Sequence, residues 1–521
     1  MRCPLLPLCL AFTIGIALAD RFIPPQMALE SIVATSVVII FNFLFNIKTL
    51  SIPLRLLPLQ TLFLPLATAL SCGIMLTTVQ QQCQEVRYPQ NWETYEMVIT
   101  SETKEGNKTI AAYATITSGQ YAGRNVRLAF DKQCPTYRNL KIGYGIEAKC
   151  HLRKPHDFKT SHFSFSRYLK TRNTPFVAFI GKGHCHTKAV SLSSMSFIQR
   201  SRLGALKLRH RLLHTYRSNG LSDESLAIAA AMSLGDKTML SPSLQDIYSI
   251  SGASHVLALS GTHLVIVFFI FSIFLRHYSR RWYGTAFLLS LTWSYVFLVG
   301  MSSSVVRSAI MISIFSLSHI AGRGKNSANS LATAATIMMA LNPQVLFDAG
   351  FQLSVAAVVG ILFATHHLSP TPTKLSTAQL RSPLLARLMP YVGLITIPIS
   401  AQIATAPLVA YHFGRLPVYF LLTNAVVLPA TTLILYLSAA SLFVSPLPIV
   451  GTLFGKLLNN VIIILNHAVT SIASLPHSSI AVGNLSPAGV ALCYSILLSI
   501  IAYLQLKSPH IVNNNKFNGK H

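Results

Sequence analysis

This chain of 521 residues has few charged residues, since Asp, Glu, Lys and Arg together make up only 11% of it. A soluble protein of this length carries about a quarter charged residues. Apolar residues account for 51%, and several windows exceed the roughly eighteen apolar residues with which a helix spans a bilayer. The composition therefore excludes an ordinary soluble protein and predicts a membrane protein with many spans.

Acidic residues are especially few, with 15 Asp and Glu against 42 Lys and Arg, so the net charge is +27. Beyond residue 247 the only carboxylate is Asp348, and the basic surplus there is largely what the positive-inside rule gives. Residues 84–190 hold 17 Lys and Arg against 8 Asp and Glu, which that rule does not explain if they lie outside the cytoplasm. A basic outer domain indicates an anionic partner such as nucleic acid or lipid headgroups.

The sequence also lacks two motifs that would indicate an enzyme. No G-x-x-x-x-G-K-[ST] loop occurs, since "AGRGKNS" lacks the first glycine and follows a membrane helix instead of a strand. "HCH" at 184–186 has a spacing that fits ligands on a strand, but no second cluster of His, Cys or carboxylate completes a metal site. We therefore expect no ATPase activity, no metal and no other cofactor.

Apolar windows and basic loops together predict the topology. The windows lie at residues 3–19, 27–47, 56–78, 255–275, 283–300, 302–322, 327–342, 346–366, 390–413, 417–443, 447–475 and 486–506. Twelve spans place both termini on one side, and the loops rich in Lys and Arg assign that side to the cytoplasm. Residues 1–19 end in "ALA" like a signal peptide, but we expect them to be retained as the first helix. Residues 79–254 then lie outside the cytoplasm.

Residues 84–190 differ in composition from the rest of the chain. "YEMVIT", "TIAAYATITS", "NVRLAF" and "YGIEAKCHL" alternate or are rich in β-branched and aromatic residues, and turn residues separate them. The pattern predicts a small all-β barrel or sandwich, and a five-stranded oligonucleotide-binding-type (OB-like) barrel fits the length. We expect the chain to consist of N-terminal membrane helices (1–83), this β domain (84–190), a basic amphipathic connector (191–248), a membrane domain (249–506) and a basic cytoplasmic tail (507–521).

Four of the eight cysteines lie around the β domain. An oxidising exterior permits disulfides. We expect Cys134–Cys150 to close a short loop and Cys83–Cys185 to tie the two ends of the domain, which is one of the three pairings that four cysteines allow. Four independent buried thiols are the alternative.

The connector contains "RSRLGALKLRHRLLHTYR" (200–217), in which five leucines stand among Lys, Arg and His. The pattern favours an amphipathic helix lying on lipid headgroups, because the leucines supply an apolar face. A basic ramp that guides a polyanion toward the membrane is the alternative.

Residues 249–264, "SISGASHVLALSGTHL", place costly polar groups at the mouth of a membrane helix. In a continuous helix Ser260 lies about 140° from His255, so the polar groups form no single stripe. A break at Gly252 or Gly261 would relax that constraint. Three interpretations stay open, namely a satisfied helix–helix contact, the polar lining of a conduit, and a Ser/His hydrolytic site that has no acid nearby in the sequence.

Two charged residues lie within the predicted spans, Arg307 in "SSSVVRSAIM" and Asp348 in "LFDAGFQLS". Charged residues inside a membrane are functional candidates. Both lie near the outer ends of their spans, so an ion pair between them fits the topology. Snorkelling of each side chain to the surface is the alternative.

These stretches resemble the ComEC family, the inner-membrane competence proteins of naturally transformable bacteria. "ISGASHVLALSGTHLVIV" resembles the signature of the family, "VVRSAIM" its arginine-bearing helix, and "FSFSRYLKTRNTPFVAF" (163–179) the end of its OB-like domain. Two further blocks, 342–362 and 401–429, match at Pro343, Asp348, Phe351, Gln352, Leu353, Ser354, Gln402, Pro407, Phe413, Asn424 and Pro429. The resemblance runs in order from about residue 1 to about residue 505.

The resemblance implies that the chain moves one DNA strand from the exterior or periplasm into the cytoplasm during transformation. The OB-like domain would contact DNA phosphates through Arg124, Arg127, Lys132, Arg138 and Lys141. Bases would stack on Tyr95, Tyr113, Tyr121, Tyr137 and Tyr144, unless these rings pack the core of the domain. Channel lining, gating and interhelical pairing are expected of His255, Ser260, Gly261, His263, Arg307, Asp348, Gln352, Ser354, Gln402 and Asn424.

Many family members add a C-terminal metallo-β-lactamase-like domain, whose His-x-His-x-Asp-His motif does not occur here. The resemblance therefore implies an inner-membrane channel that is not itself an enzyme. Its expected partners are single-stranded DNA, a periplasmic or extracellular DNA receptor, a cytoplasmic helicase or single-strand-binding protein, a separate nuclease, membrane lipid, and a second copy of the chain as a homodimer. The competing hypotheses are a transporter or flippase for anionic lipid or polysaccharide and an intramembrane Ser/His hydrolase.

Overall fold

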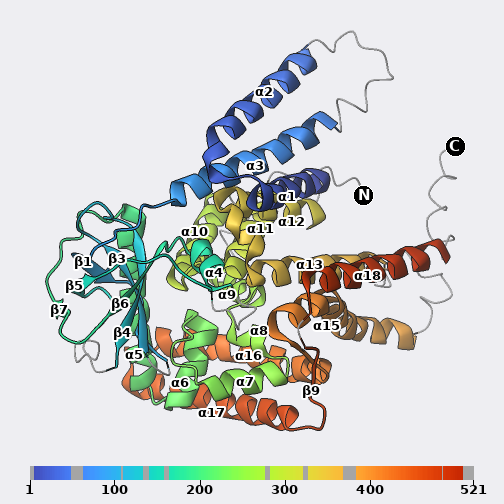
Figure 1. Ribbon diagram of the computed structural model, residues 1–521. Helices are drawn as coiled ribbons and strands as arrows, with labels where there is room; N and C mark the ends of the chain where they lie inside the picture. Colours follow the sequence, from blue (N-terminus) through green and yellow to red (C-terminus); the bar gives the residue numbers. More distant parts are fainter. Residues whose placement is uncertain are drawn as a thin grey trace.

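Helices make up most of the protein, and the outer strands gather in one small domain at its side (Figure 1). The computed structural model describes residues 5–47, 63–106, 109–132, 140–157, 164–275, 282–320, 327–367, 383–483 and 485–507. The outer domain consists of β1 (Glu93–Ile99), β2 (Lys104–Glu105), β3 (Thr109–Ile116), β4 (Asn125–Asp131), β5 (Gly145–Cys150), α4 (Phe165–Thr171), β6 (Phe176–Ile180) and β7 (Cys185–Thr187).

The helices before and after this domain are α1 (Leu5–Phe22), η1 (Pro25–Met27), α2 (Ala28–Ile47), α3 (Leu64–Gln84), α5 (Phe197–Ser218), α6 (Asp223–Ala229), η6 (Ala230–Leu234), α7 (Pro242–Ile250), α8 (Ser254–Leu257), α9 (Gly261–Phe274), α10 (Trp282–Leu298), α11 (Ser303–Ile320), α12 (Ser327–Leu341), η7 (Pro343–Phe347), α13 (Ala349–His367), α15 (Pro383–Phe413), α16 (Phe420–Phe443), α17 (Pro448–Ala473) and α18 (Pro487–Lys507). A two-stranded sheet, β8 (Arg415–Pro417) with β9 (Ser479–Ala481), joins two of the loops between them.

A helix occupies each of the twelve apolar windows of the sequence. Within the described residues, four helical segments are long and apolar enough to cross a membrane: Leu5–Phe22, Pro25–Asn42, Phe420–Phe443 and Pro448–Ala473. Further apolar helices, among them α9, α11 and α13, are shorter. These helices are those of a membrane protein. The number of spans and the side of the termini stay predictions.

Helices α1 and α3 pack closely because each presents a glycine to the backbone of the other. A Cβ on Gly15 would overlap the carbonyl oxygen of Leu70, and a Cβ on Gly73 would overlap that of Phe12. Small residues allow membrane helices to approach one another in this way. The contact explains why a helix pair with almost no charged residues holds a fixed register.

Five strands of the outer domain close into a barrel. β1 lies between β3 and β5, β3 pairs with β4, and β4 pairs in parallel with β6. Arg153, just after β5, exchanges two backbone hydrogen bonds with Val177 of β6, at 2.9 and 3.0 Å, and so joins the ends of the sheet. The β-rich segments of the sequence form β1, β3, β4 and β5, which confirms the predicted small β domain.

The barrel interior follows the alternation of apolar residues along the strands. In β4 every second residue is buried, namely Val126, Leu128 and Phe130. Successive side chains of a strand point to opposite faces, so this pattern leaves the residues between them on the outside of the barrel. The outward positions of β3 and β4 are consequently available for contacts with α4.

The cysteines of the outer domain do not pair as the sequence suggested. Cys83 is exposed at the end of α3, whereas Cys150 is completely buried in the barrel core, and both carry free thiols. The expected disulfides Cys134–Cys150 and Cys83–Cys185 are therefore wrong for this structure; Cys134 itself lies outside the described residues. Cys185 also faces the barrel core, which separates it from the exposed Cys83.

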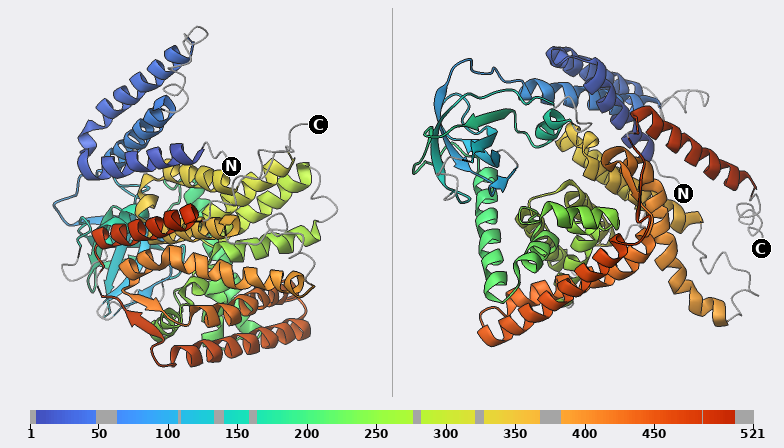
Figure 2. Two further views of the ribbon diagram at one scale, coloured as in Figure 1. Left: turned by 90° about the vertical axis from the view of Figure 1, so that its right-hand side faces the viewer. Right: turned by 60° about the horizontal axis from the view of Figure 1, so that its bottom comes forward.

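Helix α5 joins the barrel to the helical body, and protein covers most of its apolar face. Leu203 and Leu206 pack against Val98 of the barrel, and Leu213 and Tyr216 belong to the core of the helical body. The helix runs from the strands toward α16 and α17 (Figure 2). The expectation that these leucines lie on lipid headgroups is corrected by this packing, because an amphipathic pattern does not specify what its apolar face meets.

The largest core joins segments that are far apart in the sequence. Residues of α6, η6 and α7 pack with residues of α16 and α17. The Asn219 side-chain amide donates to the carbonyl and hydroxyl oxygens of Ser441, at 3.2 and 3.0 Å, across a separation of 222 positions. The connector predicted to end at residue 248 is thus built into one core with C-terminal helices.

We expect Gly15→Ala to destabilise the protein, because the added methyl group must push α1 away from Leu70. Overpacking of this kind costs about 1–3 kcal/mol. Gly204→Ala is the matched control, since Gly204 lies inside α5 with nothing within 4 Å of its Cβ position. That change should stabilise the protein by about 0.5–1 kcal/mol. Thermal unfolding of both purified variants in detergent measures the difference, and equal midpoints would contradict the close approach of α1 and α3.

Candidate functional site

The helical conformation is interrupted between α7 and α9, where the sequence places its cluster of polar residues. α7 ends at Ile250, and Gly252 has a left-handed φ of 85°. A side chain there would also press on the ring of Pro417, whose atoms lie 2.9 Å from the Cβ position. After the single turn of α8 the chain leaves the helical conformation, and α9 begins at Gly261. The predicted break is therefore present.

Ser260 and His263 close the N-terminus of α9. The backbone N–H of Ser260 donates to His263 Nδ1 at 2.9 Å, and the Ser260 hydroxyl lies 2.8 Å from the same nitrogen. A nitrogen that accepts an N–H donor carries no proton, so the proton of the neutral ring lies on Nε2. His263 is 1% exposed and its Nε2 has no hydrogen-bond partner, which leaves a buried donor unsatisfied.

Arg307 reaches the same break from α11. Its Nη2 lies 3.7 Å from the Cβ position of Gly261, and the Ser308 hydroxyl fills the space that any side chain at Gly261 would need. The Arg307 side chain is buried, and its Nε and Nη1 have no hydrogen-bond partner. Within the described ranges no carboxylate forms an ion pair with it. The helix break thus collects three donor groups that lack an acceptor.

Asp348 does not pair with Arg307, contrary to the expectation from topology. Its Oδ2 accepts the Ser303 hydroxyl at 2.6 Å and the backbone N–H of Phe351 at 3.0 Å. The carboxylate therefore caps α13 and ties it to the start of α11. A carboxylate at a helix N-terminus is stabilised by the backbone N–H groups there, so this position competes with the distant guanidinium.

Gln352 joins three elements of the helical body. Its amide nitrogen donates to the carbonyl oxygen of Leu346 in η7 at 2.9 Å, and its amide oxygen lies 2.9 Å from His412 Nε2 of α15. Because an amide oxygen only accepts, His412 Nε2 carries the proton. The Ser354 hydroxyl lies 3.2 Å from that of Ser304. Gln352 and Ser354 therefore act in interhelical pairing.

Of the remaining membrane residues singled out from the sequence, His255 lies within the break, and Gln402 and Asn424 lie on other helices. His255 lies on the exposed side of α8, with Nδ1 3.0 Å from the carbonyl oxygen of Gly252. Gln402 in α15 and Asn424 in α16 are half-buried, and neither side chain makes a hydrogen bond within the described residues. The structure groups Ser260, Gly261, His263 and Arg307, with His255 in the same break, and leaves Gln402 and Asn424 outside that group.

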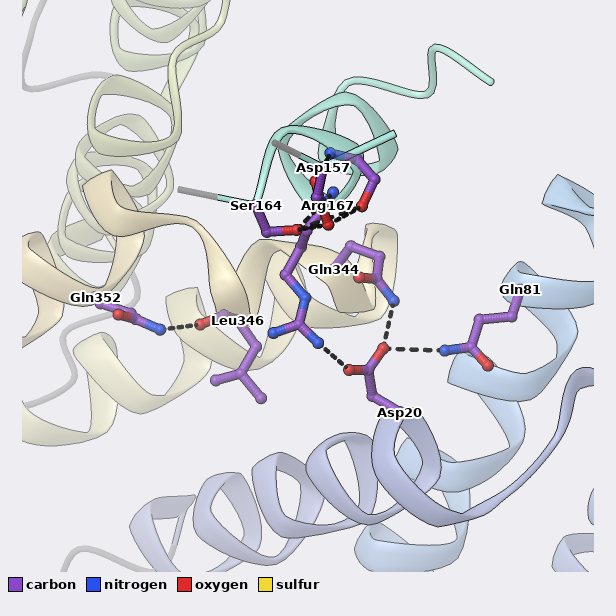
Figure 3. A network of polar contacts seen from close by, with 9 residues as sticks. Asp20, Gln81, Asp157, Ser164, Arg167, Gln344, Leu346 and Gln352 are labelled. Carbon is purple, nitrogen blue, oxygen red and sulfur yellow. Dashed lines mark hydrogen bonds and ion pairs between the residues drawn. The ribbon is translucent and has the colours of Figure 1, made fainter. Parts of the chain in front are cut away.

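Asp20, near the end of α1, ties the outer domain to the membrane helices (Figure 3). Its Oδ2 pairs with Arg167 Nη2 of α4 at 2.8 Å. Its Oδ1 accepts from the side-chain amides of Gln81 in α3 and Gln344 in η7, at 3.0 and 3.2 Å. The Asp20 side chain is 12% exposed, so water competes little for these contacts.

Helix α4 is itself fixed at its start by Asp157 (Figure 3). Asp157 Oδ1 accepts the backbone N–H of Ser166 at 2.7 Å, and the Ser164 and Ser166 hydroxyls donate to Oδ2. The backbone hydrogen bond from Ser166, followed by those from the hydroxyls, lowers the pKa of Asp157. Asp157 therefore holds the start of α4, and Asp20 binds Arg167 within the same helix.

A second tie lies at the junction of the barrel, α5 and the loop after η6. Arg209 Nη2 lies 3.2 Å from Asp236 Oδ2, and the Asp236 side chain is fully buried. The Thr238 hydroxyl lies 2.7 Å from both Asp236 Oδ1 and Glu102 Oε2, so it donates to one of them at a time. Glu102 also faces His210 Nδ1 at 3.5 Å.

The cations expected to contact DNA are spread over the outer domain. The Arg127 guanidinium lies 4.6 Å above the Phe165 ring, and Arg124 donates to the carbonyl oxygen of Cys83 at 3.4 Å. Lys132 and Lys141 are exposed. Arg138 lies outside the described residues. Arg127 is thus the member of this set that combines charge with an aromatic partner.

The tyrosines named for base stacking divide between core and surface. Tyr95 and Tyr121 are 3% and 7% exposed and belong to the barrel core, so they do not offer a stacking face. Tyr113 is half-buried on the outside of β3, and Tyr144 is exposed. Tyr137 lies outside the described residues.

Sequence analysis missed the residues that join elements. Asp20, Gln344 and His412 were not singled out, although each is a polar residue in or beside an apolar window. That placement was the available signal, because a polar group at a helix contact needs a partner. Their partners lie more than 50 positions away, which the sequence alone does not reveal.

Comparison with known proteins gives one family and two relatives. The sequence model of the family described as "Competence protein" matches residues 232–507. ComE operon protein 3 of Bacillus subtilis (strain 168) is 23% identical over 416 residues, which cover 79% of this chain and 49% of that protein. An uncharacterized protein of Aquifex aeolicus (strain VF5) is 29% identical over 157 residues, 30% of this chain and 37% of that protein. The chain thus spans half the length of these relatives or less, and no solved structure matches it.

The Asp20–Arg167 pair should show a coupling energy of about 0.5–1 kcal/mol in a double-mutant cycle with Asp20→Asn and Arg167→Gln. The control cycle uses Asp223→Asn and Arg217→Gln, whose side chains are 83% and 63% exposed although their atoms lie only 2.6 Å apart. Burial predicts weaker coupling in the control, whereas distance alone predicts stronger coupling. Thermal unfolding in detergent measures both cycles, and a larger control value would show that the Asp20 contact does not hold the domains together.

Proposed function

This chain belongs to the competence protein family, and on that premise we propose that it forms an inner-membrane channel that passes single-stranded DNA into the cytoplasm during natural transformation. The observation that carries the proposal is the buried guanidinium of Arg307, which has no carboxylate partner within the described residues. A buried cation without a partner is costly and is typical of an ion or substrate pathway in a membrane protein. The phosphodiester of a DNA strand is an anion that would supply the missing acceptor.

The helix break fits such an anion in its donors as well as in its charge. Arg307 Nε and Nη1 and His263 Nε2 are buried donors without acceptors. A phosphate has oxygen acceptors on several sides, and Arg binds it with good geometry. Gly261 keeps the backbone close to Arg307 because any side chain there would displace Ser308. The proposed role of Ser260 and His263 is to fix this arrangement at the start of α9.

The outer barrel is proposed to be an OB-like domain that receives DNA. Its five main strands follow the order β1-β3-β4-β6-β5, with a parallel β4–β6 pair, and Arg153 closes the ring against Val177. A five-stranded Greek-key barrel of this kind binds oligonucleotides in many proteins. Arg127, Lys132 and Lys141 would contribute phosphate contacts, which dominate affinity that is independent of sequence.

The remaining steps of uptake are assigned to partners. We propose that the termini lie in the cytoplasm, that an exterior receptor delivers the DNA, and that a cytoplasmic helicase or single-strand-binding protein draws the strand inward. Degradation of the second strand would fall to a separate nuclease. The membrane part itself is proposed to act as a channel and not as an enzyme.

A transporter of anionic lipid or polysaccharide would use the same unpaired donors, and it is the competing function. The two functions differ in what accumulates when the protein is absent. Loss of a DNA channel leaves DNase-protected DNA outside the inner membrane, whereas loss of a lipid or polysaccharide transporter alters the envelope and spares DNA entry.

We expect Arg307→Gln to lower entry of labelled DNA into the cytoplasm by roughly a hundredfold, since removing one charge from a buried interaction costs about 2–5 kcal/mol. Lys456→Gln is the matched control, because Lys456 is an exposed cation of α17. Both variants are expressed in a deletion strain, and DNase-protected fluorescence is counted separately in periplasm and cytoplasm. Membrane insertion and yield of each variant are measured alongside.

Unchanged cytoplasmic entry in the Arg307→Gln strain would remove Arg307 from the DNA path. Unchanged entry in the deletion strain itself, in cells shown to be transformable, would reject the DNA channel and favour lipid or polysaccharide transport. A loss of entry in both point variants would indicate a general effect of charge and not a site at the helix break.

Ser260→Ala should leave DNA entry within about threefold of the wild type, because the backbone contact from residue 260 to His263 Nδ1 remains when the hydroxyl is removed. A hydrolase that used Ser260 as its nucleophile would lose all activity with this change. The same DNA-entry assay measures the variant, and abolished entry with normal insertion would revive the hydrolase hypothesis.

A further inference from the structure

Helix α5 carries a row of cations on a face that is open to solvent. Lys207, Arg211 and His214 follow one another at spacings of four and three residues, which places them on one face of the helix. All three residues are exposed, and we call them the basic stripe. Gly204 lies one turn earlier with nothing within 4 Å of its Cβ position, so the described chain does not cover the approach to the stripe.

The acids that contact α5 are engaged by cations outside the stripe. Three such contacts join α5 to other elements, namely Asp236 with Arg209, Asp223 with Arg217 and Glu102 with His210. Among the described residues, no carboxylate forms an ion pair with the stripe. Like charges four residues apart on a helix repel each other, so Lys207 and Arg211 are unfavourable neighbours until an anion joins them.

The stripe begins against the barrel. Gly143, in the turn before β5, has a left-handed φ of 87°, and a Cβ there would overlap Lys207 Cε and lie 2.9 Å from its Nζ. The same turn carries Lys141 and Tyr144, which are both exposed. The backbone N–H of Tyr144 donates to the carbonyl oxygen of Lys141 at 3.0 Å, which fixes the turn. Turn 141–144 of the barrel therefore adjoins the first cation of the stripe.

Packing on the other side of α5 separates two kinds of anionic partner. The leucines of its apolar face are largely covered by the barrel and the helical body. Apart from Leu208, the exposed large apolar residues of α5 are Phe197 and Ile198 in its first turn, so they form no continuous face. A helix that lies on lipid needs such a face. Single-stranded nucleic acid needs cations and an aromatic surface, and Tyr144 is 44% exposed.

We propose that the basic stripe and turn 141–144 form one binding surface for single-stranded DNA, which rests on the proposed function and places the DNA along α5. Phosphates contact Lys207, Arg211 and a ring N–H of His214, and a base stacks on Tyr144. Helix α5 runs from the barrel toward α16 and α17 (Figure 2). DNA that follows the stripe therefore leaves the barrel in the direction of the helical body.

The test measures binding of a fluorescent oligothymidylate of about twenty nucleotides to the full chain in neutral detergent. One OB-type barrel covers about 4–16 nucleotides, so this length reaches beyond the barrel. The stripe variant is Lys207→Gln/Arg211→Gln. The matched control is Lys149→Gln/Arg202→Gln, which removes the same two residue types from β5 and from the opposite side of α5. Both control residues are exposed and lack an ion pair with a described carboxylate.

We expect the stripe variant to bind about tenfold more weakly at roughly 0.1 M salt, and the control to stay within about twofold of the wild type. The slope of log affinity against log salt should fall by about 1.4 in the stripe variant, since each phosphate contact on a single strand contributes about 0.7. The charge-preserving variant Lys207→Arg/Arg211→Lys should bind like the wild type. Tyr144→Leu should lose about fivefold or more in affinity with an unchanged salt slope, because stacking releases no counterions.

Each other outcome overturns a separate part of the proposal. Equal affinities of the stripe variant and the control, with tight binding by the wild type, reject the stripe and leave the DNA channel standing. No binding by the wild type at low salt rejects the DNA function itself. Unchanged affinity of Tyr144→Leu removes the base contact.

Two further measurements separate DNA binding from a lipid site and from a structural role. If phosphatidylglycerol raises the melting temperature of the wild type but not of the stripe variant, while their oligonucleotide affinities are equal, the stripe binds lipid headgroups instead. The stripe variant should melt at or above the wild-type temperature, because the removed charges repel each other. A lower melting temperature, together with weak binding by the charge-preserving variant, would show that the two side chains are structural and would reject the phosphate contacts.

Discussion

The carboxylate of Asp20 ties the outer domain to the N-terminal membrane helices through three hydrogen-bonding partners on three other elements. One side chain at the end of α1 receives Arg167 from α4, Gln81 from α3 and Gln344 from η7. The same η7 carries Leu346, which accepts from Gln352, so the network reaches the helix that Asp348 caps. The contacts that orient α4 and those that fix the start of α13 therefore both involve η7.

The scarcity of acids explains both the joints of this protein and its candidate sites. With 15 carboxylates among 521 residues, those at Asp20, Asp236 and Glu102 are used where separate parts of the chain meet. The cations cannot all be neutralised, and one of them, Arg307, is buried at the helix break without a carboxylate partner among the described residues. A protein that handles a polyanion gains from such a surplus, because each unpaired cation is an interaction that only the polyanion completes.

Local patterns predicted the parts of this fold, and long-range contacts decided the rest. Apolar windows gave a helix in every case, the alternating or β-branched segments gave β1, β3, β4 and β5 but not β6, and glycine placed the break before α9. The predicted ion pair between Arg307 and Asp348 does not form, because the Ser303 hydroxyl and the N-terminus of α13 bind the Asp348 carboxylate. The apolar leucine face of α5 was visible in the sequence. Whether lipid or protein covers that face depends on how the barrel and the helical body pack against α5.

The core shared by α6, η6, α7, α16 and α17 has a consequence for biosynthesis. Asn219 meets Ser441 across 222 positions, so at about 5–20 residues per second the first half of the core waits roughly 10–45 s for the second. During that interval Tyr216 and Tyr248 have no partner helices to cover them. The nascent chain must therefore be shielded by the insertion machinery over about two fifths of its synthesis, and truncations before α17 should be cleared by proteolysis and not accumulate as partly folded protein.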